Sequence, residues 1–213
     1  MLFDSPQTHA LALHTSSSQL GLAIANFSGD FRDRVWDLQR ELSTHLHPYL
    51  AEFIQPQTWK NLAFLAVAKG PGSFTSTRIG MVTARTLAQQ LDIPLFAISS
   101  LAGFAWSQKA LFSIGEPIAV EYPAKRGAIF SAIYQLTPQG DRLETILPDT
   151  VMISEQWQAK RQDFERIPKI LSIEGDLGYT VGSILELAAI AWQHGDRPHW
   201  SEALPFYGQH PIQ

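Results

Sequence analysis

A glycine-rich turn is the clearest candidate for binding chemistry in this chain. Residues 69–80 read KGPGSFTSTRIG, between an apolar run and a helical pattern. Backbone N–H groups in such a turn point toward the start of the helix, where they can hold an anion or let another segment pack closely. The spacing fits neither common phosphate motif, because Lys69 precedes the glycines and the third glycine of a dinucleotide fingerprint is missing. The candidate residues are Gly70, Gly72 and Ser73, and N-capping of the helix is the simpler role for Ser73.

Three further polar residues could join this turn. His14 and Thr15 end the first apolar run, and Asp176 lies in the sequence GDLG at 175–178. Together with the turn they would form a weak or vestigial site for a nucleotide or another anion. A structural role is the simpler interpretation for both His14 and Asp176. His14 would be a hydrogen-bonded buried histidine, and Asp176 would belong to a turn that caps the last helix.

The remaining histidines and serines do not form a catalytic or metal motif. His45 and His47 are two residues apart, so on a helix they would diverge by about 200°. The sequence contains no HExxH, no Gly-x-Ser-x-Gly and no cysteine. We therefore predict no metal site, no catalytic residue and no tightly bound cofactor; ATP or ADP remains possible only at an interface between lobes or subunits.

Composition limits the class of protein. The 213 residues are 45% apolar and 17% charged, with a formal net charge of −4. A protein that grips a nucleic-acid backbone by itself usually has a basic face, so we do not expect autonomous binding of RNA or DNA.

No stretch approaches the ~20 apolar residues of a membrane span. The start has no basic segment before an apolar one. The expected location is the cytoplasm.

Two helices are predicted in the first half. Residues 43–54 have apolar positions at helical spacing, and the helix that leaves the glycine turn has one face of small residues and one mixed face of Arg, Met and Val. Such a mixed face is commoner at a partner contact than on plain surface, although a partly buried helix with two snorkelling arginines explains it equally well. The candidate interface residues are Leu46, Tyr49, Leu50, Arg78, Met81, Val82 and Arg85.

The order of elements predicts an α/β fold. Strands are expected at 10–14, 20–27, 35–38, 62–68 and 95–98, and a hairpin at 117–121 and 128–136. Residues 137–168 look loop-rich. A further strand at 169–173 and a helix at 181–193 complete the pattern.

These motifs resemble the TsaB (YeaZ) family, bacterial proteins of tRNA threonylcarbamoyladenosine formation. The strongest part of the resemblance is residues 66–105, AVAKGPGSFTSTRIGMVTARTLAQQLDIPLFAISSLAGFA. Weaker parts are LALHTSS at 11–17, STHLHPYL at 43–50, KRGAIFSAIY at 125–134 and LPFYG at 204–208. The resemblance implies a two-lobed actin/Hsp70/sugar-kinase fold of mixed sheets with flanking helices. We place the lobes at residues 1–104 and 105–213, with the last segment able to pack back on the first lobe.

The resemblance also implies a role as a partner. TsaB-like proteins pair with the catalytic paralogue TsaD through the two first-lobe helices, which correspond here to 43–54 and 73–91. That assembly, helped by the ATPase TsaE, transfers threonylcarbamoyl to adenosine 37 of tRNA. The same helices can support a homodimer, and tRNA contact is expected only through the complex.

The chain departs from the family where chemistry would be expected. The first strand usually ends in Asp-Thr-Ser, but here it ends in His14-Thr15-Ser16. Mg²⁺ prefers oxygen ligands, so an imidazole is a poor replacement for the aspartate. A second-lobe motif with two carboxylates appears as PAKRGA at 123–128, without either. These losses favour a non-catalytic scaffold that activates a TsaD-like transferase. A self-standing ATPase or small-molecule kinase of the same fold is the alternative.

Overall fold

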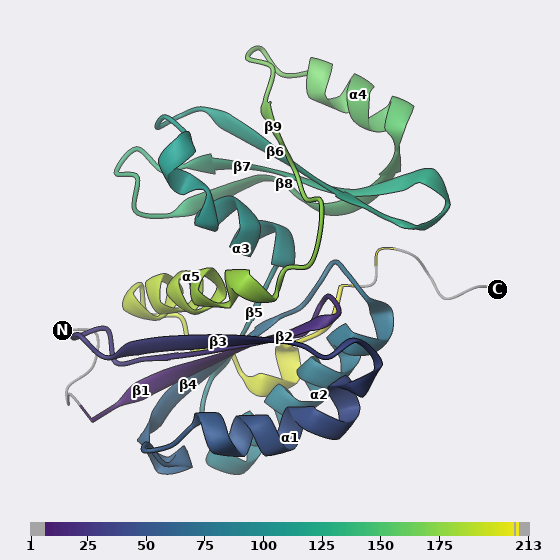
Figure 1. The fold of residues 1–213 in the computed structure, drawn as a ribbon. Coiled ribbons are helices and arrows are strands. Elements are labelled where there is room, and N and C mark those ends of the chain that lie inside the picture. The colour runs from purple at the N-terminus through teal and green to yellow at the C-terminus, as the bar shows by residue number, and fades with distance from the viewer. Residues whose placement is uncertain (1–6, 207, 209–213) are drawn as a thin grey trace.

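The computed structural model describes residues 7–206 and 208, and it shows two lobes (Figure 1). The first lobe holds a five-stranded sheet in the order β3-β2-β1-β4-β5. Its strands are β1 (His9–His14), β2 (Gln19–Ala25), β3 (Phe31–Asp37), β4 (Leu62–Ala68) and β5 (Leu95–Ile98). The sheet is mixed, because β1, β2 and β3 pair antiparallel whereas β4 pairs parallel with both β1 and β5.

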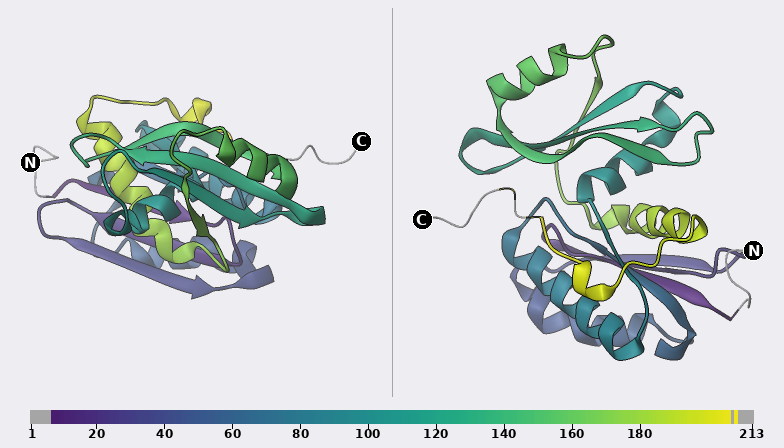
Figure 2. Two further views of the ribbon diagram at one scale, coloured as in Figure 1. Left: turned by 90° about the horizontal axis from the view of Figure 1, so that it is seen from above. Right: turned by 180° about the vertical axis from the view of Figure 1, so that it is seen from behind.

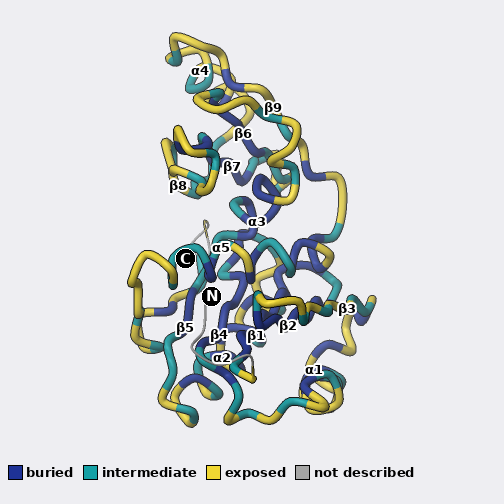
Figure 3. Tube along the Cα trace, turned by 90° about the vertical axis from the view of Figure 1, so that its left-hand side faces the viewer, coloured by how far each residue is buried: buried dark blue, intermediate teal, exposed yellow. Residues whose placement is uncertain are grey.

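Helices cover both faces of this sheet. The helices α1 (Leu42–Phe53) and α2 (Phe74–Leu91) pack on one face, and α5 (Val181–Gln193) packs on the other, between the two lobes (Figure 1). Alternation along β1 explains the arrangement, since Leu11 and Leu13 face the α1–α2 side while Ala10 and Ala12 face α5. The strands at the centre are buried on both sides (Figure 3).

The second lobe holds a four-stranded sheet in the order β8-β7-β6-β9. Its elements are α3 (Ser100–Ser107), β6 (Pro117–Pro123), β7 (Ala128–Leu136), β8 (Leu143–Ile153), α4 (Ser154–Gln162) and β9 (Lys169–Ser172). The helix α3 packs on one face of the sheet and on α5, and α4 packs on the other face through Trp157. Short 3₁₀ helices lie at Gln39–Glu41, Trp59–Asn61, Lys109–Leu111, Lys125–Gly127, Gly178–Thr180 and Trp200–Glu202.

The predicted hairpin in the second half is confirmed by the antiparallel pairing of β6 and β7. The prediction of a loop-rich stretch at 137–168 is wrong, since this stretch contains the eleven-residue strand β8 and the helix α4. Pro148 and several polar residues conceal β8 in the sequence. They are tolerated because β8 is an edge strand with its outer side in solvent.

Two smaller differences concern the third strand and the boundary between the lobes. The third strand begins at Phe31 rather than at Val35, because the charged residues of an edge strand obscure its pattern. The division that we placed between residues 104 and 105 falls inside α3, and α5 returns the chain from the second sheet to the first. In the described part of the chain no helix is long and apolar enough to cross a bilayer.

Candidate functional site

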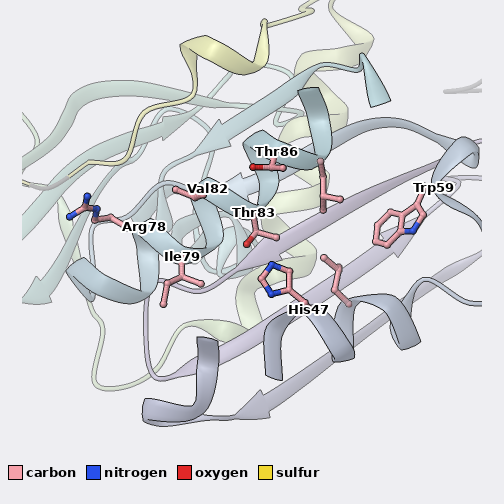
Figure 4. A pocket seen from close by; sticks show the side chains of 9 residues that line it. His47, Trp59, Arg78, Ile79, Val82, Thr83 and Thr86 are labelled. Atoms are coloured by element: carbon pink, nitrogen blue, oxygen red, sulfur yellow. The ribbon is translucent and has the colours of Figure 1, made fainter. Parts of the chain in front are cut away.

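A groove of about 560 Å³ runs between α1 and α2 (Figure 4). The helix α1 contributes one wall, α2 contributes the other, and Trp59 closes one end. Its lining is His47, Leu50, Trp59, Arg78, Ile79, Val82, Thr83, Thr86 and Leu87. Arg78 is the only permanently charged residue of this lining, and its guanidinium lies 5.2 Å from the centre of the Phe74 ring. The groove is therefore mainly apolar, with one cation at its side.

Small residues hold α2 in the position that forms this groove. A Cβ atom at Gly80 would lie 2.1 Å from Oγ1 of Thr15, so only glycine lets the helix approach the end of β1 this closely. Ala84 and Ala88 continue the same buried face. With that face on the sheet, Val82 points outward and is 62% exposed. An exposed β-branched residue on a well-packed helix is available to a partner.

The predicted interface residues divide into two groups. Val82 and Arg78 are exposed, Arg85 is half-buried, and Tyr49 is half-buried and stacked on Trp36 at a ring distance of 5.0 Å. These four can meet a partner.

Leu46, Leu50 and Met81 are instead core residues, with exposed fractions of 0%, 2% and 2%. This corrects the expectation that they are exposed for a partner. Leu46 and Leu50 lie one turn apart on the stripe of α1 that faces the sheet, and Met81 falls on the same stripe of α2 as Ala84 and Ala88. Leu50 still reaches the floor of the groove.

Several groove residues were missed from the sequence. Ile79, Thr83 and Thr86 line the groove beside the predicted Val82. Ile79 and Thr86 lie three residues before and four residues after Val82, and Thr83 lies four residues after Ile79, so helical spacing from Val82 would have found them. Trp59 comes from a 3₁₀ helix before β4, and no spacing rule connects it to α2.

A second cavity, of about 630 Å³, adjoins the groove at Ile79, which lines both. It lies at the N-terminal ends of α1 and α2, and seven of its nine lining residues are polar. Its other lining residues are Ser18, Gln39, Arg40, Leu42, Ser43, Ser73, Thr75 and Ser76. The groove thus passes from an apolar part into a part rich in hydroxyl groups.

The glycine turn is filled by the protein's own chain. The Ser73 N–H donates to the Ser16 carbonyl at 2.7 Å, and a Cβ atom at Gly72 would lie 2.0 Å from that same oxygen. At Gly70, which has a φ of +93°, a Cβ atom would lie 2.9 Å from the Phe206 carbonyl oxygen. Thr15 Oγ1 donates to the Ser76 carbonyl at 2.9 Å. The glycines therefore serve close packing of backbone on backbone.

Ser73 occupies the N-cap position of α2, but it does not cap the helix with its side chain. Its hydroxyl donates to Ser76 Oγ at 3.0 Å instead of accepting from a backbone N–H. The position predicted for the cap is confirmed, and the capping hydrogen bond is not.

His14 is fully buried at the end of β1. Its Nδ1 accepts a long hydrogen bond of 3.4 Å from the Ser16 N–H, and its Nε2 has no hydrogen-bond partner among the described residues. The expectation of a fully hydrogen-bonded histidine is therefore only half met. Burial lowers the pKa of His14 to about 3, so the imidazole is neutral at physiological pH.

Asp176 connects the two lobes. Its carboxylate accepts hydrogen bonds from the Ser18 N–H at 3.0 Å and from Ser18 Oγ at 2.8 Å. The neighbouring Leu177 N–H donates to Ser17 Oγ at 3.1 Å. The expectation that Asp176 caps the last helix is wrong, because its side chain reaches the turn between β1 and β2.

The sequence did not reveal a second polar contact between the lobes. Ser99 Oγ donates to Asp149 at 2.7 Å, and the Tyr134 hydroxyl donates to the same carboxylate oxygen at 3.1 Å. Burial, as the largest cause, raises the pKa of Asp149. Tyr134 and Asp149 lie on the consecutive strands β7 and β8, whereas Ser99 follows β5 and is 50 residues from Asp149 in the sequence.

The fold thus brings His14, Thr15, Gly70, Gly72 and Ser73 together where β1 and β4 end, with Asp176 nearby across the lobes. Thr15 and Ser73 already bond to the protein's own backbone, and both glycines lie against it. No group of three or more His, Asp or Glu side chains that could hold a metal ion is found within residues 7–206.

Sequence comparison gives a consistent set of relatives. A model of the family TsaD, tRNA N6-adenosine threonylcarbamoyltransferase, matches residues 37–165, more than half of the chain. The Bacillus subtilis tRNA threonylcarbamoyladenosine biosynthesis protein TsaB is 30% identical over 158 residues, which cover 73% of this chain and 67% of that protein. A tRNA N6-adenosine threonylcarbamoyltransferase of Campylobacter curvus is 24% identical over 170 residues, covering 80% of this chain and 45% of that enzyme.

Solved structures agree on the fold. YeaZ from Pseudomonas aeruginosa has a TM-score of 0.74 at 21% identity, covering 94% of this chain and all of that one. A second Pseudomonas aeruginosa structure, described as similar to peptidase YeaZ, has a TM-score of 0.76 at 22% identity, covering 95% of this chain. The predicted two-lobed α/β fold of mixed sheets with flanking helices is confirmed, and these two structures share it. From the sequence match to the Bacillus subtilis protein, the chain belongs to the TsaB (YeaZ) family.

Proposed function

We propose that this protein is a non-catalytic subunit in tRNA threonylcarbamoyladenosine formation and that it supports a TsaD-like threonylcarbamoyltransferase. The observation that carries the proposal is the apolar groove between α1 and α2, with the exposed Val82 on its wall. Fully burying a valine side chain contributes about 1.5–3 kcal/mol, and most of that remains available in the isolated chain. The Arg78 side chain adds a cation that can pair with a partner carboxylate.

The kinship with the transferase supports the choice of partner. The family model that matches residues 37–165 is that of TsaD itself, and this range includes both helices of the groove. A paralogue of the same fold presents two corresponding helices. Two such surfaces can pack face to face about a pseudo-two-fold axis, as in an isologous dimer. The same geometry would allow a homodimer, so the transferase and a second copy of this chain compete for one surface.

The filled glycine turn supports a scaffold rather than an ATPase or kinase. A nucleotide at this turn would have to displace the Ser16 carbonyl from Gly72 and the Phe206 carbonyl from Gly70. The neutral His14 supplies no negative charge for a metal ion. In this proposal the protein works in the cytoplasm, a TsaE-like ATPase joins the assembly, any nucleotide binds at an interface, and tRNA is met only through the complex.

Light scattering coupled to size exclusion tests the proposal. The purified chain is mixed with the TsaD-like paralogue of the same organism, and the mass of the eluting species is measured. We expect a heteromeric complex at micromolar concentration. Two separate species at the masses of the single proteins, with and without ATP and the TsaE-like protein, would contradict it.

A further inference from the structure

The end of the described chain crosses from one lobe to the other. We refer to residues 203–206 with Gly208 as the strap. Before it, the Leu95 N–H donates to the Pro198 carbonyl at 3.3 Å, and Trp200 packs on the first-lobe core. Ala203, at 3% exposed, belongs to that core. Seen from behind, this yellow segment runs over the first lobe and then rises toward the level between the lobes (Figure 2). The strap is therefore anchored in the first lobe.

Its middle lies on the glycine turn. The Phe206 N–H donates to the Lys69 carbonyl at 2.7 Å. On the other side of the same residue, the Phe206 carbonyl oxygen lies 2.9 Å from the position of a Cβ atom at Gly70. Backbone of the strap thus covers backbone of the turn, with no side chain between them.

Its end fits into the second lobe. The Phe206 side chain packs with the second-lobe core cluster that includes Phe130 and Val151. A Cβ atom at Gly208 would lie 2.5 Å from Val151 Cγ2 and 2.9 Å from Phe130 Cε1. A glycine is needed there, because any side chain would push the strap away from β7 and β8.

The strap meets the lobes where they already touch. Lys69, which accepts the strap's hydrogen bond, is close enough to Asp149 to lower the pKa of that carboxyl group, against the larger opposing effect of burial. Asp149 in turn accepts from Ser99 and Tyr134. Between its two anchored ends the strap is partly in solvent, since the Leu204 side chain is 63% exposed. The end of the strap is held on the second lobe by the contacts of Phe206 and Gly208 with Phe130 and Val151.

We propose that the strap fixes the orientation of the two lobes and closes the space over the glycine turn, and that the lobes separate at this turn only when the strap detaches. The α1–α2 groove lies on the opposite face of the first sheet from α5 and the second lobe (Figure 1). This inference is therefore independent of the proposed partner.

Because the sequence contains no cysteine, spin labels can be attached at two introduced cysteines and the distance between the lobes measured without removing native thiols. Cysteines for spin labels replace two exposed glutamines, Gln89 on α2 and Gln158 on α4. Double electron–electron resonance then gives the distribution of distances between the lobes. In this background Phe206→Ala removes the anchor in the second lobe, and Leu204→Ala is the matched control, because Leu204 is in the same segment but mostly exposed.

We expect a narrow distribution for the parent and for Leu204→Ala, and a broader one shifted to longer distance for Phe206→Ala. If Phe206→Ala does not fold, Gly208→Val decides the matter, because it displaces the strap without removing a core side chain. Circular dichroism confirms that each compared variant is folded. Distributions of the strap variants that superimpose on that of the parent would overturn the proposal.

Discussion

The buried His14 should make the stability of this protein fall on mild acidification. Its pKa is lowered by burial from 6.5 to about 3 in the folded chain, whereas in the unfolded chain it titrates at the ordinary value. Between these two values the unfolded state binds a proton that the folded state does not. The free energy of unfolding therefore decreases as the pH falls below about 6.5, and the loss from His14 is complete only below its folded pKa.

The size of this loss follows from the shift. Each unit of pH between the two pKa values costs about 1.4 kcal/mol at 25 °C. Lowering the pH from 7.5 to 5.0 crosses roughly 1.5 units of that range, so His14 should contribute about 2 kcal/mol of destabilisation. This is a large fraction of the ~5–15 kcal/mol that stabilises a typical domain.

Urea unfolding followed by the fluorescence of the six tryptophans measures the effect. The wild type is compared with His14→Gln and His14→Leu, neither of which titrates, at pH 7.5, 6.5, 5.5 and 5.0. Each variant can lose stability at every pH, but its loss between pH 7.5 and 5.0 should be smaller than that of the wild type by about 2 kcal/mol. His9, which is paired with Asp30, is present in all three proteins and its contribution cancels. Parallel pH profiles for the wild type and both variants would refute the assignment.

Two further predictions concern the packing of the turns. Gly72→Ala should destabilise the fold by about 3 kcal/mol or more, because the new Cβ would overlap the Ser16 carbonyl. Gly175→Ala is the control: a Cβ there meets nothing within 4 Å, so stability should change by less than about 0.5 kcal/mol. Equal urea midpoints for the two variants would contradict this prediction. Ser18→Ala removes a hydrogen bond to the Asp176 carboxylate and should lower the free energy of unfolding by about 1.5–3 kcal/mol. The Leu177 amide, which donates to Ser17 next to this contact, should then exchange its hydrogen faster. Unchanged exchange at Leu177 would show that this contact does not hold the lobes together.

The fold was predictable where a local pattern determined the element. The alternation and apolar runs of β1, β4, β6 and β7, and the helical spacing of α1, α2 and α5, predict elements that the structure contains. β8 was not predictable, because Pro148 and its polar residues are acceptable only on the edge of a sheet, and edge position depends on the tertiary fold.

The candidate site was predictable only in part. The sequence placed Val82 and Arg78 on one helix face, and the structure places both on the wall of a groove. It could not separate them from Met81, since one residue of rotation, about 100°, decides between groove and core. The contacts Ser99–Asp149 and Ser18–Asp176 join residues 50 and 158 positions apart, which no local pattern encodes.

The affinity of the Val82→Asp variant for the TsaD-like paralogue tests the central claim most directly. Isothermal titration calorimetry would compare it with the wild type and with Gln158→Asp, which adds the same charge to an exposed position of α4 in the second lobe, away from the groove. If α1 and α2 form the interface, burying an unpaired carboxylate in the groove should weaken binding at least about tenfold, or 1.4 kcal/mol, while Gln158→Asp changes the affinity by less than about twofold. Equal dissociation constants for Val82→Asp and the wild type would show that the groove is not where the partner binds.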